Sequence, residues 1–239
     1  MSKAMIDKRK WLKDSIPFTG GLLQVQWAPL LVLFLLRSLL NIWAEDAVQV
    51  MTSTSDESSR WAIQLGLAGW DLIEGVLLLL ILSWGIPKIR PPQSARIMLS
   101  PFTQPYLGSF LAEYLRQLAQ VLMWALLLLI PGFFRYCKLI FVPMIALFSV
   151  DYREGRVDAL RLSERLVSGR LFLIMGLMAL TMGCQFLLGF APEMNASLHT
   201  YFFRMFFDLI DFVINVWSFV LLFLLFEKFL NEAAPEELQ

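Results

Sequence analysis

Acidic and basic side chains interrupt the long apolar runs of this sequence, and several of them stand three residues apart. Asp71 and Glu74 are two carboxylates within the apolar run near 62–86. The i, i+3 spacing places both on one face of a helix. They lie near the middle of the run, where few cations occur at the same depth, and carboxylates in such a position can bind a proton or a cation. The pair is therefore a candidate proton or cation site.

Charged residues also occur in the other apolar runs: Arg37, Glu113, Arg116, Arg135, Lys138, Arg204, Asp208 and Asp211. An ionisable group costs about 2.5–3.5 kcal/mol at the centre of a membrane helix, so these side chains must point into the protein. Mutual pairing that holds the helices in register is the interpretation we favour. It predicts that the two aspartates of the last run meet Arg135 and Lys138 at matching depth. A lipid or anion pocket lined by Arg37, Arg135 and Lys138 is the alternative.

The elements that must position these charges are apolar helices. Of the 239 residues, 58% are hydrophobic and 17% are charged, whereas a soluble domain has roughly 45–50% and 25%. About 20 apolar residues in a helix cross the hydrocarbon core of a bilayer. The sequence predicts six such segments, near 26–43, 62–86, 107–130, 133–150, 171–190 and 202–230. The expected fold is all-α, a polytopic integral membrane protein with about six transmembrane helices.

The third and fourth segments are separated only by Pro131 and Gly132. Adjacent proline and glycine break a helix. We therefore expect a tight helical hairpin at one membrane face, and one long kinked helix is the alternative.

Lysine and arginine are distributed unevenly among the connections between the segments. They gather in three stretches, 1–25, 87–106 and 151–170. By contrast, residues 44–61 hold only Arg60. The positive-inside rule assigns the basic connections to the cytoplasm. Both termini are thus expected to be cytoplasmic, with 1–25 as a basic segment ahead of the membrane domain 26–230 and with 231–239 as an acidic tail.

Residues 151–170 have the pattern of an amphipathic helix. Leu160 and Val167 fall on one side, and Arg161 and Arg165 are spaced i, i+4 on another. A solvated connecting helix is the interpretation we favour. A surface for the headgroups of anionic lipids is the alternative. Its candidate contacts are Arg153, Arg156, Arg161, Arg165 and Arg170.

Several kinds of chemistry are disfavoured by composition. His199 is the only histidine, and Cys137 and Cys184 both lie in apolar runs. Metal clusters that use histidine, catalytic triads and cysteine–histidine pairs therefore cannot be assembled, and no metal or cofactor is expected. The formal net charge is zero, so no nucleic-acid partner is expected either.

A series of motifs follows the third segment. The residues are Pro131-Gly132-Phe133-Phe134-Arg135, then Phe141-Val142-Pro143, then Ala159-Leu160-Arg161-Leu162-Ser163, and finally Leu166, Ser168 and Gly169. In this order, the second half of the chain resembles a broad group of multi-pass bacterial membrane proteins. The group includes the membrane domain attached to some glycerophosphodiester phosphodiesterases. The resemblance implies an all-helical protein of the bacterial inner membrane. It does not imply phosphodiesterase activity, which resides in a separate soluble domain of those fusions.

Together these features favour a non-enzymatic inner-membrane protein. It is expected to bind membrane lipid, with anionic lipid as one option, or a membrane partner, which includes a second copy of the chain. Binding would use the charged helix-bundle interior and the basic cytoplasmic face. The alternative is a small transporter or channel with a proton or cation site at Asp71 and Glu74. A membrane-embedded hydrolase is a third option, for which only carboxylates could serve.

Overall fold

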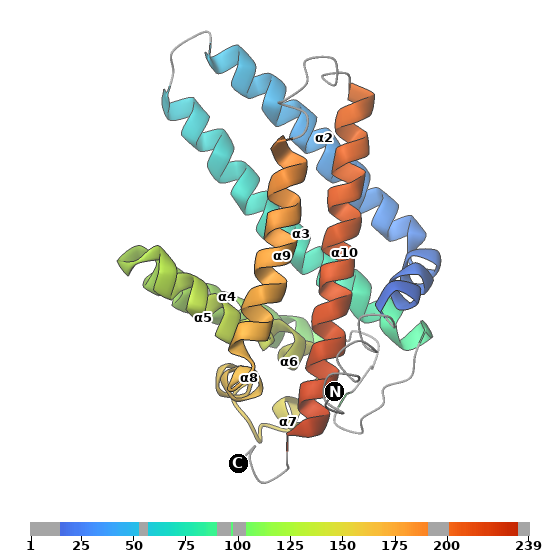
Figure 1. Ribbon diagram of the computed structural model, residues 1–239, viewed down its shortest axis with the longest axis vertical. Helices are drawn as coiled ribbons and strands as arrows, with labels where there is room; N and C mark the ends of the chain where they lie inside the picture. The colour runs from blue at the N-terminus through green and yellow to red at the C-terminus, as the bar shows by residue number, and fades with distance from the viewer. Residues whose placement is uncertain (1–14, 53–56, 90–96, 98–103, 191–200, 234–239) are drawn as a thin grey trace, which may run out of the picture.

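The computed structural model describes residues 15–52, 57–89, 97, 104–190 and 201–233, which are almost entirely helical (Figure 1). No strand occurs among these residues. The predicted all-α class is therefore confirmed.

Nine helices are described in full, and residues 15–25 form a further helix ahead of them. They are α2 (Trp27–Thr52), α3 (Glu57–Ile89), α4 (Gln104–Leu127), α5 (Leu129–Leu139), α6 (Val142–Phe148), α7 (Val150–Arg153), α8 (Ala159–Val167), α9 (Leu171–Phe190) and α10 (Tyr201–Glu232). The long helices α2, α3, α9 and α10 make two antiparallel pairs, and α10 also contacts α2. The short helices α6, α7 and α8 gather near one end of α10 (Figure 1).

Four helical stretches among the described residues are long and apolar enough to cross a membrane. They are Trp27–Ala44, Ile130–Phe148, Leu171–Leu188 and Met205–Glu232. A shorter apolar stretch, Leu72–Ile86, lies within α3. The chain therefore has the helices of a membrane protein, whereas six crossings and the side on which the termini lie remain predictions.

The core surrounds the C-terminal part of α10. The ring of Phe141 lies 5.9 Å from the rings of Phe226 and Phe229, measured between centroids. Phe148 packs edge-on against Phe223 at 5.2 Å. All seven residues of α6 are buried. Aromatic packing thus fixes α6 against α10 inside the protein.

The segment predicted near 133–150 is not one continuous helix. It divides into α5, α6 and α7, with a turn at Ile140–Phe141 and an extended residue at Ser149. The N–H of Phe141 donates to the hydroxyl of Ser163 at 3.3 Å, outside any helical pattern. Pro143, in the first turn of α6, has no N–H to donate. A contact with α8 and a proline together end α5 and restart the chain as α6.

The predicted hairpin between the third and fourth segments is present, and the alternative of one long kinked helix is wrong. The predicted position of the break is corrected, because Pro131 and Gly132 lie within α5 and the chain turns before them. Leu128 alone separates α4 from α5, in an extended conformation with φ −159° and ψ 136°. Pro131 occupies the first turn of α5, where a missing N–H costs no helical hydrogen bond. A Cβ atom on Gly132 would stand 2.7 Å from the Cα of Ala125. Glycine at this position therefore lets the two helices pack closely.

Of the amphipathic helix predicted over 151–170, the part Ala159–Val167 is present as α8, whereas a turn follows α7 and separates it from α8. The N-cap of α8 is Asp158, whose carboxylate accepts hydrogen bonds from the first turn. Leu160 and Val167 are buried, whereas Arg161 and Arg165 are exposed. Helix α8 thus packs its apolar side on α5 and α6 and leaves its arginines on the surface.

Candidate functional site

A buried ion cluster joins three of the long helices. Nη1 of Arg37, on α2, lies 3.0 Å from Oε1 of Glu74 on α3, and its other Nη atom is paired with Asp211 on α10. The three side chains are 14%, 8% and 18% exposed. Removal of one partner from so buried a group would leave the others uncompensated. We call these three residues the Arg37 cluster.

Two amides extend the Arg37 cluster to a fourth helix. Nδ2 of Asn215 donates to Oδ2 of Asp211 at 3.4 Å, one turn along α10. Nε2 of Gln185, on α9, donates to Oδ1 of Asn215 at 2.8 Å. A continuous polar chain therefore runs from α3 through α2 and α10 to α9. Sequence reasoning missed both amides because it followed charge alone; the i, i+4 spacing of Asp211 and Asn215 was the available signal.

The predicted partners of these charges are corrected by the geometry. Asp211 pairs with Arg37, and not with Arg135 or Lys138, because α5 packs mainly on α4, α8 and α9. The premise that Glu74 lacks a cation at its depth is likewise wrong. Asp208 lies one turn before Asp211 and adds to the electrostatic attraction on Arg37. The side chains of Asp71 and Arg204 lie outside those that the structure describes.

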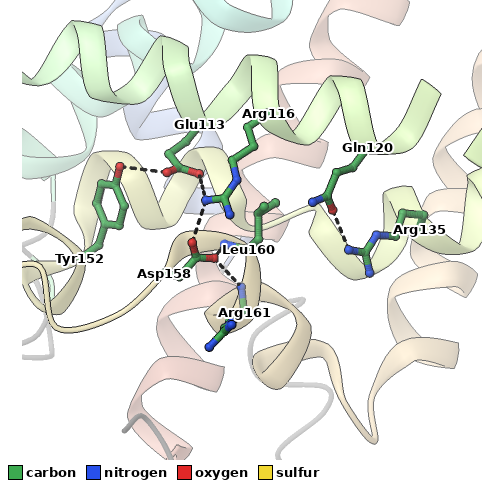
Figure 2. Close-up of polar contacts among 8 residues, drawn as sticks. All are labelled: Glu113, Arg116, Gln120, Arg135, Tyr152, Asp158, Leu160 and Arg161. Carbon is green, nitrogen blue, oxygen red and sulfur yellow. Dashed lines mark hydrogen bonds and ion pairs between the residues drawn. The ribbon is translucent and has the colours of Figure 1, made fainter. Parts of the chain in front are cut away.

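A second polar cluster, the α4–α8 cluster, consists of Glu113, Arg116, Tyr152 and Asp158 (Figure 2). Nη1 of Arg116 lies 2.7 Å from Oδ2 of Asp158 and 3.5 Å from Oε2 of Glu113. The hydroxyl of Tyr152 donates to Oε1 of Glu113 at 3.4 Å. Glu113 and Arg116 belong to α4 and were predicted to be intramembrane charges. They are instead bonded to the connection predicted to be cytoplasmic.

Asp158 links this cluster to the start of α8. Its Oδ1 accepts from the N–H groups of Leu160 at 3.0 Å and Arg161 at 3.1 Å. Burial alone would raise the pKa of Asp158, but the hydrogen bond from Arg116 and the two backbone N–H groups outweigh burial, so the pKa lies below its ordinary value. Burial raises the pKa of Tyr152, and the neighbouring Glu113 acts in the same direction.

Arg135 ties the hairpin to α8 as well. One Nη atom donates to Oε1 of Gln120, on α4, at 2.6 Å, and the other is paired with Glu164 on α8. Figure 2 shows Gln120 and Arg135 facing each other across the hairpin. Glu164, like Asp158, was not among the predicted site residues because it lies in a polar connection.

A basic pocket lies between the end of α5, one side of α8 and the start of α9. Its volume is about 460 Å³. It is lined by Lys138, Arg161, Glu164, Arg165, Val167, Ser168, Gly169 and Leu171. Lys138 was predicted to lie in the membrane interior, but its side chain is exposed and lines the same pocket as Arg161 and Arg165 of α8. Within the described part of the chain, neither Lys138 nor Arg161 carries an ion pair.

The other three arginines predicted to contact lipid headgroups, Arg153, Arg156 and Arg170, interact with groups of the protein itself. Nη2 of Arg153 donates to the carbonyl of Leu147 at 2.6 Å. Arg156 lies 2.6 Å from Glu154. Arg170 is 2.6 Å from Glu232. Of the five arginines proposed from sequence, Arg161 and Arg165 are therefore the two that line the basic pocket.

No group of three or more histidine, cysteine, aspartate or glutamate side chains that could hold a metal ion occurs among the described residues. The candidate sites that the described residues form are the Arg37 cluster, the α4–α8 cluster with the pocket beside Tyr152 and Asp158, and the basic pocket.

Neither a protein-family model, nor a curated protein, nor a solved structure matches the chain. The resemblance of the second half to bacterial multi-pass proteins therefore stays a prediction.

Proposed function

We propose that the chain is a multi-pass protein of the bacterial cytoplasmic membrane and that its basic pocket binds the headgroup of an anionic lipid. The observation that carries the proposal is the convergence of Lys138, Arg161 and Arg165 on one cavity of about 460 Å³. A phosphate group carries the complementary charge and accepts several hydrogen bonds from cationic side chains.

The charge balance of the pocket supports an anionic ligand. Glu164 is the one carboxylate that lines it, and Arg135 already pairs with that carboxylate. Lys138 and Arg161, which carry no ion pair among the described residues, therefore have no other carboxylate in the pocket lining to neutralise them. Each basic residue near an anionic lipid surface contributes about 1 kcal/mol of attraction.

The surroundings of the pocket favour a lipid over a soluble anion. Leu171 lines the pocket and begins α9. Only 11% of the apolar stretch Leu171–Leu188 is buried inside the protein, and Phe172 is 86% exposed. An apolar helix surface beside a cationic pocket offers one site for acyl chains and another for the headgroup.

The positive-inside distribution supports a cytoplasmic position for the pocket and for both termini. The pocket residues belong to the basic stretch 151–170 or lie next to it. With either six or four crossings the two termini lie on the same side of the membrane, because both numbers are even, and the basic stretch 1–25 favours the cytoplasmic side. By contrast, the ion pair of Glu74 with Arg37 argues against a transport site that uses Glu74, since this carboxylate already has a cation beside it.

Native mass spectrometry of the purified protein can test the proposal. Protein in mild detergent would be mixed with phosphatidylglycerol or with phosphatidylcholine, which have similar acyl chains and different net charge. We expect Lys138→Gln with Arg161→Gln to weaken phosphatidylglycerol binding by about 2 kcal/mol, roughly thirtyfold.

Lys88→Gln with Arg156→Gln is the matched control, because it removes the same charge from exposed residues away from the pocket. The control should retain phosphatidylglycerol. Equal retention by both double variants, or equal binding of the two lipids by the parent, would contradict the proposal.

A further inference from the structure

The α4–α5 hairpin has a polar base and an apolar end. At the base, Arg116 and Arg135 bind Asp158 and Glu164, so both helices are fixed to α8. Beyond the base, every residue from Val121 to Ile130 is hydrophobic. Polarity thus changes abruptly along the hairpin, at about the position of Gln120.

The apolar end is exposed on all sides. Leu126, Leu127, Leu128 and Ile130 are 87%, 68%, 67% and 70% exposed. Successive residues of a helix point in directions about 100° apart. The exposed residues of α4 near this end, which are Leu122, Met123, Trp124, Leu126 and Leu127, therefore lie around most of the helix and do not form a single face. A docked protein covers one face, whereas the acyl chains of a bilayer cover all sides.

The length of the apolar end suits one leaflet. Leu128 is eight residues beyond Gln120, a distance of about 12 Å along α4 at 1.5 Å per residue. All of α5, with 11 residues, spans about 16 Å. The hydrocarbon core of a bilayer is about 30 Å thick. A hairpin whose base lies at one interface is therefore too short to pass the middle of the membrane, whatever its tilt.

The one irregular residue of the turn has no unpaired backbone group. The irregular conformation is limited to Leu128, and both backbone groups of this residue are hydrogen-bonded. Its N–H donates to the carbonyl of Trp124 at 3.0 Å, and its carbonyl accepts from the N–H of Gly132 at 3.2 Å. Pro131 removes one more donor from the first turn of α5. Unsatisfied backbone groups are what usually exclude turns from the acyl layer.

The orientation of the hairpin agrees with its length. Figure 1 shows α4 and α5 running across the direction of α9 and α10, with their free end level with the body of α9. The apolar stretch Ile130–Phe148 has the composition of a crossing, but its second half is α6, which is wholly buried in the protein.

We infer that the α4–α5 hairpin is a re-entrant element, which enters the bilayer from the side of α8, holds its apolar end among the acyl chains of that leaflet and returns to the same side. The membrane is then crossed by α2, α3, α9 and α10. The six-crossing prediction is replaced, while both termini keep their expected side. This inference does not depend on lipid binding in the basic pocket.

Cysteine labelling from both sides of the membrane tests the inference. The protein would carry Leu128→Cys in a background of Cys137→Ala and Cys184→Ala. A membrane-impermeant maleimide would be added to spheroplasts and to inside-out vesicles. We expect no labelling at position 128 from either side and full labelling in SDS, whereas Ser109→Cys, at the base of α4, should react in inside-out vesicles.

A spin label at position 128 separates burial in protein from burial in lipid. We expect strong relaxation of the label by oxygen and weak relaxation by a water-soluble nickel chelate, as at the centre of a bilayer. Labelling of Leu128→Cys in spheroplasts would show a complete crossing. Labelling in inside-out vesicles, or low oxygen accessibility, would place the hairpin outside the acyl layer. Each of these results would overturn the inference.

Discussion

Arg37→Gln is expected to be among the most destabilising single substitutions outside the aromatic core. The substitution removes both ion pairs of Arg37 and leaves Glu74 and Asp211 without their cation. Those carboxylates are only 8% and 18% exposed. Loss of one partner from a well-buried ion pair typically costs about 3–5 kcal/mol, mostly because a charge is left unpaired. We expect a loss of about 3 kcal/mol or more in the free energy of unfolding.

Two further variants distinguish the cost of leaving a buried charge unpaired from the cost of losing the ion pair itself. Asp211→Asn leaves Arg37 paired with Glu74 at 3.0 Å. Its cost should be nearer the average coupling of about 0.6 kcal/mol between hydrogen-bonded groups in membrane proteins. The triple variant Arg37→Gln, Glu74→Gln, Asp211→Asn removes both carboxylates that pair with Arg37, so that Asp208 alone keeps a charge that Arg37 attracted. It should therefore be more stable than Arg37→Gln alone, despite carrying two more substitutions.

Unfolding of the purified protein in mixed micelles of increasing SDS content would measure these differences. Arg156→Gln is the matched control, because Arg156 is also paired with a carboxylate but is 66% exposed. Exposed pairs contribute about 0–1 kcal/mol. The reasoning would be refuted if Arg37→Gln cost no more than Arg156→Gln, or if the triple variant were no more stable than Arg37→Gln.

Three other outcomes follow from the contacts around α8 and the hairpin. The lowered pKa of Asp158 means that its charge stabilises the fold above about pH 4 and that this contribution is lost as pH falls through the lowered pKa. The variant Asp158→Asn, which keeps an N-cap side chain, should therefore be less stable than the parent at pH 7 and should approach the parent's stability in acid. A stability difference that does not change with pH would refute this. Gly132→Ala should lower the free energy of unfolding by about 1–3 kcal/mol, because the new Cβ would meet the backbone of Ala125 at 2.7 Å. Thermal unfolding in detergent would measure this loss, and an unchanged midpoint would show that the helices can separate freely. Ser163→Ala should lower the free energy of unfolding by about 1–3 kcal/mol in the same measurement, because the buried N–H of Phe141 loses its acceptor. The control Ser109→Ala, at an exposed position, should leave the unfolding midpoint unchanged.

Local signals in the sequence predicted some features correctly. Pro131 and Gly132 predicted the hairpin because both residues act within one turn of their own position. The alternation of Leu160 and Val167 with Arg161 and Arg165 predicted α8 and its exposed side, since helical periodicity is also local. Apolar composition predicted helices of membrane-spanning length.

The partners of the charges could not be predicted in the same way. Matching by depth assumes that every apolar segment lies along the membrane normal, and α4 and α5 run across α9 and α10 (Figure 1). Arg135 and Lys138 were consequently assigned to the depth of Asp211, although Arg135 reaches Glu164 on α8. The break at Phe141 depends on Ser163, 22 residues away. No local pattern reports such a contact.

The central claim is that an anionic headgroup occupies the basic pocket, and covalent mapping of a bound lipid tests it most directly. The parent protein would be placed in nanodiscs that contain phosphatidylglycerol with a photoreactive group on its headgroup. We predict cross-links to residues 161–171 and to the segment around Lys138, and a strong reduction of both by Lys138→Gln with Arg161→Gln. Cross-links spread evenly over all basic connections, or unchanged in that double variant, would contradict the account.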